Sequence, residues 1–191
     1  GMIGDGTITN RSSPVQVGAL TTWAKVACLG NATLALKTDG ALWAFGSNNA
    51  GQLGQGNTTN YSSPVQVGAL TTWSKIGAGG EAGYSIKTDG TLWSWGANWS
   101  GPLGLGDSVY RSSPVQVGAL TTWSTITGGD KFAAGVATDG TLWTWGYNFY
   151  GALGQGNTTS YSSPVQVGAL TTWLKAETGP VSSGLFGFKT P

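Results

Sequence analysis

The 191-residue chain contains only 9% charged residues and has a net charge of +1, although 39% of its residues are hydrophobic. So small a net charge argues against nucleic acid or an anionic membrane surface as a partner. The absence of histidine removes the commonest general base and metal ligand, and the single cysteine, Cys28, excludes a disulfide framework or a cysteine-based zinc cluster.

The abundant residues indicate the kind of secondary structure. The chain has 33 glycines and 10 tryptophans, with many threonines, serines and asparagines. This mixture is typical of short strands, tight turns and aromatic packing rather than of helices. No apolar run approaches the roughly eighteen residues of a membrane-spanning helix. We therefore expect an all-β chain without a membrane partner.

A segment of identical sequence, SSPVQVGALTTW, begins at Ser12, Ser62, Ser112 and Ser162, always fifty residues apart. A fixed period of this length is typical of solenoids, arrays and propellers. We divide the single repeat domain, residues 1–191, into the end of a unit (2–23), three whole units (24–73, 74–123 and 124–173) and the start of another (174–191). The two end pieces together make one divided unit that lacks only its third strand.

Each whole unit contains four strand-like pieces. In the second unit they are residues 73–78, 83–88, 91–95 and 114–117, which alternate bulky and small side chains as β-strands do. Asp39-Gly40, Asp89-Gly90 and Asp139-Gly140 stand between the second and third pieces, where they predict two-residue type I′ turns. These aspartates are therefore expected in turns rather than in catalysis. The sequence predicts a β-propeller of four-stranded antiparallel blades of about fifty residues each.

Aromatic residues recur at fixed places in the units. Because a single blade cannot cover both of its own faces, we interpret these rows as packing between blades rather than as ligand sites. The rows are Trp43, Trp93 and Trp143; Phe45, Trp95 and Trp145; and Trp23, Trp73, Trp123 and Trp173.

The run TDGTLWSWGANWSGPLGLGD, followed by SSPV, resembles the repeats of the regulator-of-chromosome-condensation (RCC1-like) family. The corresponding runs are residues 39–56, 89–106 and 139–156, with a remnant at residues 4–6. The resemblance implies a β-propeller, seven-bladed in the family, that acts as a binding scaffold. Family members exchange nucleotide on a small GTPase while docking on chromatin, inhibit a β-lactamase or sense ultraviolet light. None of these activities can be transferred residue by residue.

Three whole blades and one divided blade are too few for the ring that the resemblance implies. We therefore expect apolar blade faces to be exposed at both ends. A homodimer, in which the tail of one chain pairs with the head of the other, would close a ring of about eight blades. The alternative is that the sequence is a piece of a longer protein.

The differences between units lie in the loops after the first and third strands, which share one face of an antiparallel blade. The loops on the other face, TDG and GALTT, hardly change. Variable loops on a rigid scaffold are typical of a binding surface, although relaxed selection or contact with an adjacent blade would also explain them. The candidate partner-binding residues are Asn49, Glu81, Trp99, Asp130, Lys131, Phe132, Phe149 and Tyr150.

The sequence favours a non-catalytic interaction scaffold that presents these loops to a macromolecular partner, either a protein or a glycan. The alternative is a carbohydrate-binding or adhesive module of a secreted, cell-surface or viral protein. We do not expect an enzyme, because no nucleophile–base pair and no carboxylate cluster outside the turns is visible. No cofactor, metal or nucleic acid is expected.

Overall fold

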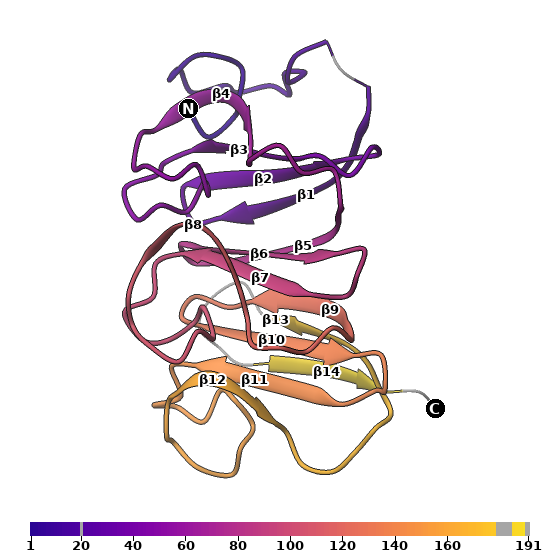
Figure 1. Ribbon diagram of the computed structural model, residues 1–191. Helices are drawn as coiled ribbons and strands as arrows, with labels where there is room; N and C mark the ends of the chain where they lie inside the picture. The colour runs from indigo at the N-terminus through magenta and orange to yellow at the C-terminus, as the bar shows by residue number, and fades with distance from the viewer. Residues whose placement is uncertain (20, 179–184, 190–191) are drawn as a thin grey trace.

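The computed structural model describes residues 1–19, 21–178 and 185–189, the last of these as backbone only. The described residues form fourteen strands and no helix. The sheets follow one another along the chain and lie side by side (Figure 1). The first is formed by β1 (Trp23–Leu29), β2 (Ala32–Lys37), β3 (Leu42–Gly46) and β4 (Tyr61–Gln66).

Two further four-stranded sheets repeat this pattern, and a two-stranded sheet follows them. The second sheet contains β5 (Trp73–Gly79), β6 (Ala82–Lys87), β7 (Leu92–Gly96) and β8 (Arg111–Gln116); the third contains β9 (Trp123–Gly128), β10 (Phe132–Ala137), β11 (Leu142–Gly146) and β12 (Tyr161–Gln166). The last contains β13 (Trp173–Thr178) and β14 (Leu185–Lys189). All paired neighbours are antiparallel. The predicted all-β fold with three whole blades and a partial one is confirmed, and we number the four sheets as blades 1 to 4.

The turn between the second and third strands differs from the predicted type I′ turn. No non-glycine residue among those described has a positive φ, whereas Gly90 has a φ of 77°. The amide of Gly90 donates to the Lys87 carbonyl, and the Asp89 carboxylate accepts from the amide of Thr91. This side-chain bond favours Asp89 at negative φ, so Thr88, Asp89 and Gly90 form a three-residue loop in which only glycine takes the left-handed conformation.

The first strands of successive blades lie innermost and pack closely. The amide of Gly30 donates to the Gly80 carbonyl of the next blade at 2.6 Å. A Cβ atom on Gly77 would lie 2.8 Å from the Ile126 carbonyl oxygen. Only glycine permits such an approach of two backbones. Small residues in the first strands therefore bring the blades together around a common axis.

The outer parts of the blades are joined by tryptophan. Trp95 of blade 2 is fully buried with Leu34 and Leu42 of blade 1, and its Nε1 donates to the Gln52 carbonyl at 3.0 Å. Trp145 of blade 3 repeats the bond with Pro102 at 2.7 Å. These contacts support the interpretation of the row of Phe45, Trp95 and Trp145 as packing between blades.

The glycine-rich loop of each blade packs against the invariant SSPV segment of the next blade. The amides of Gly56 and Gly106 donate to the carbonyls of Ser112 and Ser162, at 2.7 and 2.8 Å. At the N-terminus, Gly6 donates to Ser62 in the same way, at 2.9 Å. Residues 1–6 therefore occupy, on blade 1, the place that residues 51–56 occupy on blade 2. Residues 14–17 correspond to the fourth strand of a whole unit but form no strand, because no third strand of the described residues lies beside them.

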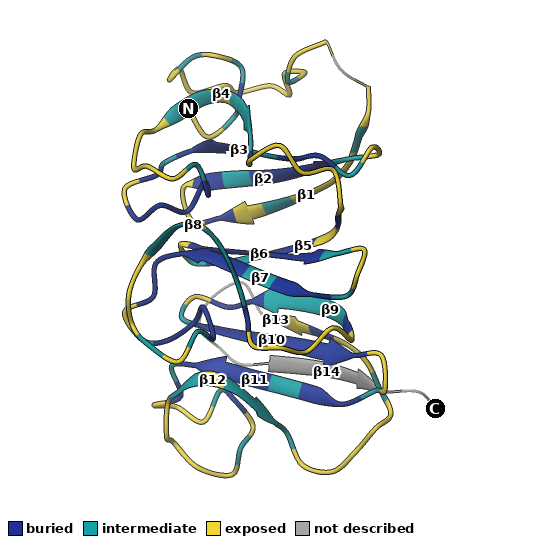
Figure 2. Ribbon diagram, in the orientation of Figure 1, coloured by how far each residue is buried: buried dark blue, intermediate teal, exposed yellow. Residues whose placement is uncertain are grey.

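The described blades leave parts of two faces uncovered. Val26 of β1 is 62% exposed, whereas the equivalent Ile76 of β5 is 2% exposed. Figure 2 shows exposed residues along β1. At the other end, Gly151 and Gly154 are exposed, although the equivalent Gly51 and Gly54 are buried. In the described residues, an apolar side chain is thus exposed on blade 1 and the glycine-rich loop of blade 3 is uncovered.

Candidate functional site

The loops that vary between blades lie together at one edge of each sheet. The amide that follows each third strand donates to the carbonyl of the loop between the first and second strands. These bonds are Ser47 to Asn31, Ala97 to Glu81 and Tyr147 to Lys131, at 2.8, 3.0 and 2.9 Å. The invariant loops meet at the other edge, where Thr88 donates to Thr72. We call the first edge the variable-loop face.

A buried asparagine makes each long loop of this face rigid. In blade 2 the Asn98 side chain is fully buried; its Oδ1 accepts from the Leu103 amide, and its Nδ2 donates to the Asp107 and Val109 carbonyls. Asn48 and Asn148 make corresponding bonds in blades 1 and 3. The residue that follows each asparagine is exposed and is held in a fixed place. The sequence shows these asparagines recurring in every whole unit, but their role in the loop was not predicted.

Four aromatic side chains of the variable-loop face lie in contact. The ring centroids of Trp99 and Tyr147 are 6.2 Å apart, and Tyr147 stacks on Phe149 at 6.2 Å with an interplanar angle of 17°. Tyr150 meets Phe149 edge-on at 5.1 Å. Trp99, Phe149 and Tyr150 are 51%, 64% and 80% exposed. We call these four residues the aromatic strip; sequence reasoning missed Tyr147, which is half-buried at its centre.

Lys131 lies against two rings of the strip. Its Nζ lies 4.6 Å from the Trp99 ring centroid and 5.7 Å from that of Tyr147. The same Nζ lies 3.8 Å from the Asp130 carboxylate. An ammonium placed over aromatic rings is attracted to their faces. Because a carboxylate also lies near it, Lys131 acts as a support for the rings rather than as a free positive charge.

The other predicted residues have separate places. Asn49 of blade 1 and Glu81 of blade 2 are exposed on the variable-loop face. Phe132 was predicted to bind a partner but is only 3% exposed. It takes the place of Ala32 and Ala82 at the start of the second strand, where the side chain faces the interior. Phe132 is therefore not accessible to a partner in this structure.

Tyr150 owes its exposure to its place in the array. The equivalent Ala50 is buried, and Ser100 is half-buried with its hydroxyl bonded to the Lys131 carbonyl of the next blade. A hollow of about 260 Å³ lies beside Tyr150, between Lys131 and Tyr147. Position 149, by contrast, is exposed like its equivalents Asn49 and Trp99. Trp99 and Phe149 therefore occupy a position that is exposed in every whole blade, whether or not another blade follows.

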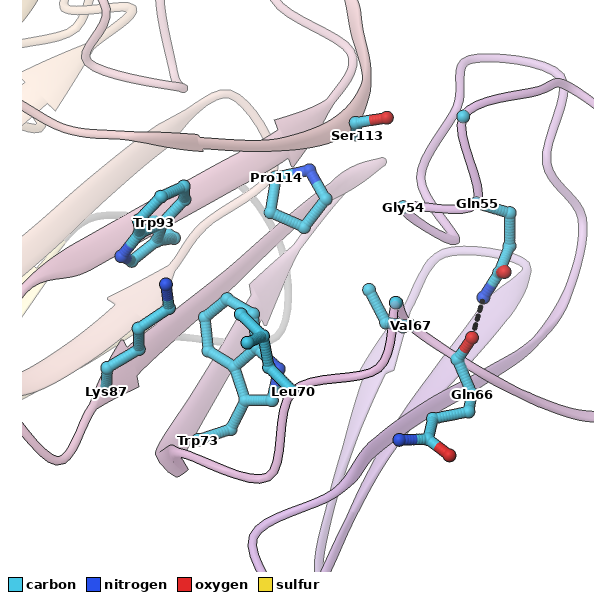
Figure 3. Close-up of a pocket in the computed structure, with 12 residues that line it drawn as sticks. Gly54, Gln55, Gln66, Val67, Leu70, Trp73, Lys87, Trp93, Ser113 and Pro114 are labelled. Atoms are coloured by element: carbon cyan, nitrogen blue, oxygen red, sulfur yellow. Dashed lines mark hydrogen bonds between the residues drawn. The ribbon is translucent and has the colours of Figure 1, made fainter.

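A larger cleft, of about 440 Å³, lies between blades 1 and 2 and shares no residue with the strip (Figure 3). Its walls contain Trp73, Lys87 and Trp93 from blade 2 and Gln55 and Val67 from blade 1. Most of these positions recur in every unit, but Lys87 and Gln55 do not. We call it the perimeter cleft.

Two of the carboxylates with displaced pKa values, Asp89 and Asp139, belong to the turns between the second and third strands. Hydroxyl bonds from Thr91 and Thr141 hold the pKa values of Asp89 and Asp139 below their ordinary value. A carboxyl group with a lowered pKa stays ionised and is a poor general acid at neutral pH. The described residues contain no group of three metal-ligating side chains and no helix that could span a membrane.

Comparison with known proteins identifies the repeat. The family model described as "Regulator of chromosome condensation (RCC1) repeat" matches residues 39–83, 89–136 and 139–181. A second model with this description matches residues 23–52 and 123–152. No curated protein matches the sequence as a relative.

Solved structures show the same fold at low sequence identity. Human WBSCR16 is 21% identical with a TM-score of 0.73, over 82% of this chain and 43% of that protein. Prp20p of Saccharomyces cerevisiae, described with its binding properties to Gsp1p and histones, is 20% identical with a TM-score of 0.76, over 91% and 45%. Yeast RCC1 (Prp20) bound to Kap60 is 19% identical with a TM-score of 0.75, over 91% and 44%. The chain thus spans less than half the length of these proteins.

Proposed function

The chain belongs to the regulator of chromosome condensation (RCC1) repeat family, and on that premise we propose that it is a non-catalytic scaffold whose variable-loop face binds a macromolecular partner. Propellers of this family are commonly interaction scaffolds, and the structural neighbour Prp20 is described with protein partners. The identity of the partner does not transfer with the fold.

One observation carries the proposal. Trp99 and Phe149 expose half or more of their surface on loops that buried asparagines hold rigid. Exposed aromatic rings give a large contact area, and their rigid placement lowers the entropy lost on binding. Neither ring belongs to the rows that pack between blades, so the fold does not require them.

Capture experiments test this proposal. Wild-type protein and the double variant Trp99→Ala/Phe149→Ala are immobilised, and captured proteins and glycoproteins are quantified by mass spectrometry. A matched control is Leu120→Ala/Leu170→Ala, which removes two exposed apolar side chains near the invariant loops. We expect a partner that the control retains and the double variant loses. Equal capture by all three proteins would refute the assignment of this face.

A glycan is the second candidate ligand, and the strip itself favours it. Stacked rings suit the apolar face of a sugar, and Lys131 is already engaged by Asp130 and the rings. A neutral sugar would therefore fit better than an anionic one. A glycan array without hits, or sugar binding unchanged by Trp99→Ala, would remove this candidate and leave a protein partner.

We also propose that a second copy of the chain covers the uncovered blade faces and closes a ring of about eight blades. The repeated contacts between blades support this. A Cβ atom on Gly51 or Gly101 would lie 2.6 or 2.8 Å from the Cα of the serine that begins SSPV in the next blade. Gly151 has no described atom within 4 Å of such a Cβ. In the proposed ring, Gly151 would pack against Ser12 of a second copy, because Ser12 is the equivalent of Ser112 and Ser162.

Two glycine variants test the dimer. Gly151→Ala would place a methyl group in the proposed contact. Gly168 also has a positive φ, but a Cβ atom there, or at its equivalents Gly18, Gly68 and Gly118, would meet no described atom within 4 Å. We expect light scattering to give twice the chain mass for wild type and for Gly168→Ala, with dimerisation weakened about tenfold or more in Gly151→Ala. A wild-type monomer at micromolar concentration would contradict the proposal.

A further inference from the structure

The perimeter cleft has the properties of a ligand site. Its volume of about 440 Å³ lies within the range of small-molecule pockets, about 300–1,000 Å³. The walls come from two blades: Gln55 and Val67 stand on one side, and Trp73 and Trp93 on the other (Figure 3). Leu70 and Pro114 add further apolar surface. Pockets of this kind, lined mainly by apolar groups with a few polar ones, are typical of small-ligand sites.

One ammonium group defines the polarity of the cleft. Nζ of Lys87 lies 3.6 Å from the Trp93 ring centroid and 5.1 Å from that of Trp73. No carboxylate of the described residues lies within ion-pair distance of this amino group. The charge of Lys87 acts on Asp89 at longer range, but the two side chains do not form an ion pair. The ammonium therefore has hydrogen-bond donors that no acidic side chain takes. Figure 3 shows this amino group beside the Trp93 ring.

The repeats themselves show that the blade contact does not need this ammonium. Between blades 2 and 3, Leu105 stands where Gln55 stands and Ala137 where Lys87 stands, and Leu105 packs with Trp143 against the core. Before blade 1, the equivalents are Asp5 and Lys37, and Arg11 pairs with Asp5 at 2.8 Å. Among the blade contacts that the structure describes in full, only the perimeter cleft thus combines a lysine at position 87 with a residue at position 55 that is not acidic and not apolar.

We propose that the perimeter cleft binds an amphipathic carboxylate. Its carboxylate pairs with Nζ of Lys87, and its apolar body packs against Leu70, Trp73 and Pro114. A charge-assisted bond in a partly enclosed apolar cleft is stronger than one in water. A cationic ligand would be repelled by Lys87, and a neutral apolar ligand would leave the ammonium without an acceptor.

Calorimetric titration with hexanoate tests the proposal, with hexanol as the uncharged comparison. We expect saturable binding of hexanoate and at least about tenfold weaker binding of hexanol. Lys87→Met keeps an apolar stem over Trp93 and removes the charge, so it should weaken hexanoate binding about tenfold or more without improving hexanol binding. Trp99→Ala/Phe149→Ala should bind hexanoate as wild type does.

The second variant, Gln55→Leu/Lys87→Ala, copies the residues found between blades 2 and 3, so the fold is known to accept them. Its circular dichroism spectrum and melting temperature should stay close to those of wild type while hexanoate binding is lost. Three results would each overturn the proposal: no saturable binding of hexanoate, equal affinity for hexanoate and hexanol, or hexanoate binding that survives the removal of Lys87.

Discussion

Gly51→Ala is expected to destabilise the contact between blades 1 and 2. Gly51 has a φ of 77°, which a residue with a Cβ adopts at a cost of about 1–2 kcal/mol. The new Cβ would lie 2.6 Å from the Cα and 2.9 Å from the Cβ of Ser112. Because neighbouring backbone must move, overpacking adds about 1–3 kcal/mol. The free energy of unfolding should therefore fall by about 2–5 kcal/mol in total.

Gly118→Ala is the matched control. Gly118 also has positive φ, 58°, but a Cβ there would meet no atom within 4 Å. This variant should lose only the conformational part, about 1–2 kcal/mol. The difference between the two variants measures the contact between the blades.

Urea unfolding followed by circular dichroism gives the loss in each variant, and hydrogen exchange locates it. The amide of Gly56, bonded to the Ser112 carbonyl at 2.7 Å, should exchange faster in Gly51→Ala than in Gly118→Ala. Equal losses of stability, with unchanged exchange at Gly56, would refute the reasoning that the glycine-rich loop holds one blade to the next.

Two further changes test other parts of the account. Trp95→Phe copies Phe45 of blade 1 and should lower the free energy of unfolding by about 1–3 kcal/mol, because the Gln52 carbonyl loses its buried donor. Trp93→Phe changes a half-buried residue and should lower it by less in the same urea titration. The pKa values of Asp89 and Asp139 are lowered in the folded state, so their contribution is complete above the ordinary carboxyl pKa of about 4 and is lost as pH falls through the lower folded values. Urea midpoints measured from about pH 5 to about pH 2 should therefore fall less steeply in Asp89→Asn/Asp139→Asn than in wild type, and parallel curves would contradict this assignment.

The blades could be predicted because three independent sequence signals agree. Alternation defines the strands, the Asp-Gly pairs mark the turns, and the fifty-residue period implies stacking. The predicted turn conformation was wrong because the prediction considered only that Asp tolerates a positive φ. It omitted the hydrogen bond that the Asp carboxylate accepts from the amide two residues later. That bond is visible only with the geometry of Asp89 and Thr91 in place.

The candidate site could be predicted only in part. Exposure of Trp99 and Phe149 followed from their absence from the recurring rows. Phe132 was misassigned because it varies between units, yet it occupies an inward position at the start of β10. The perimeter cleft could not be foreseen, since Gln55 and Lys87 come from different units and meet only when the blades pack.

The most direct test of the proposed function is the affinity of a captured partner for three proteins: wild type, Trp99→Ala/Phe149→Ala and Leu120→Ala/Leu170→Ala. If the aromatic strip is the recognition surface, the first pair of changes should weaken binding at least about 30-fold, equivalent to about 2 kcal/mol, and the second pair less than about threefold. Unchanged affinity in Trp99→Ala/Phe149→Ala, with both proteins folded by circular dichroism, would contradict the account.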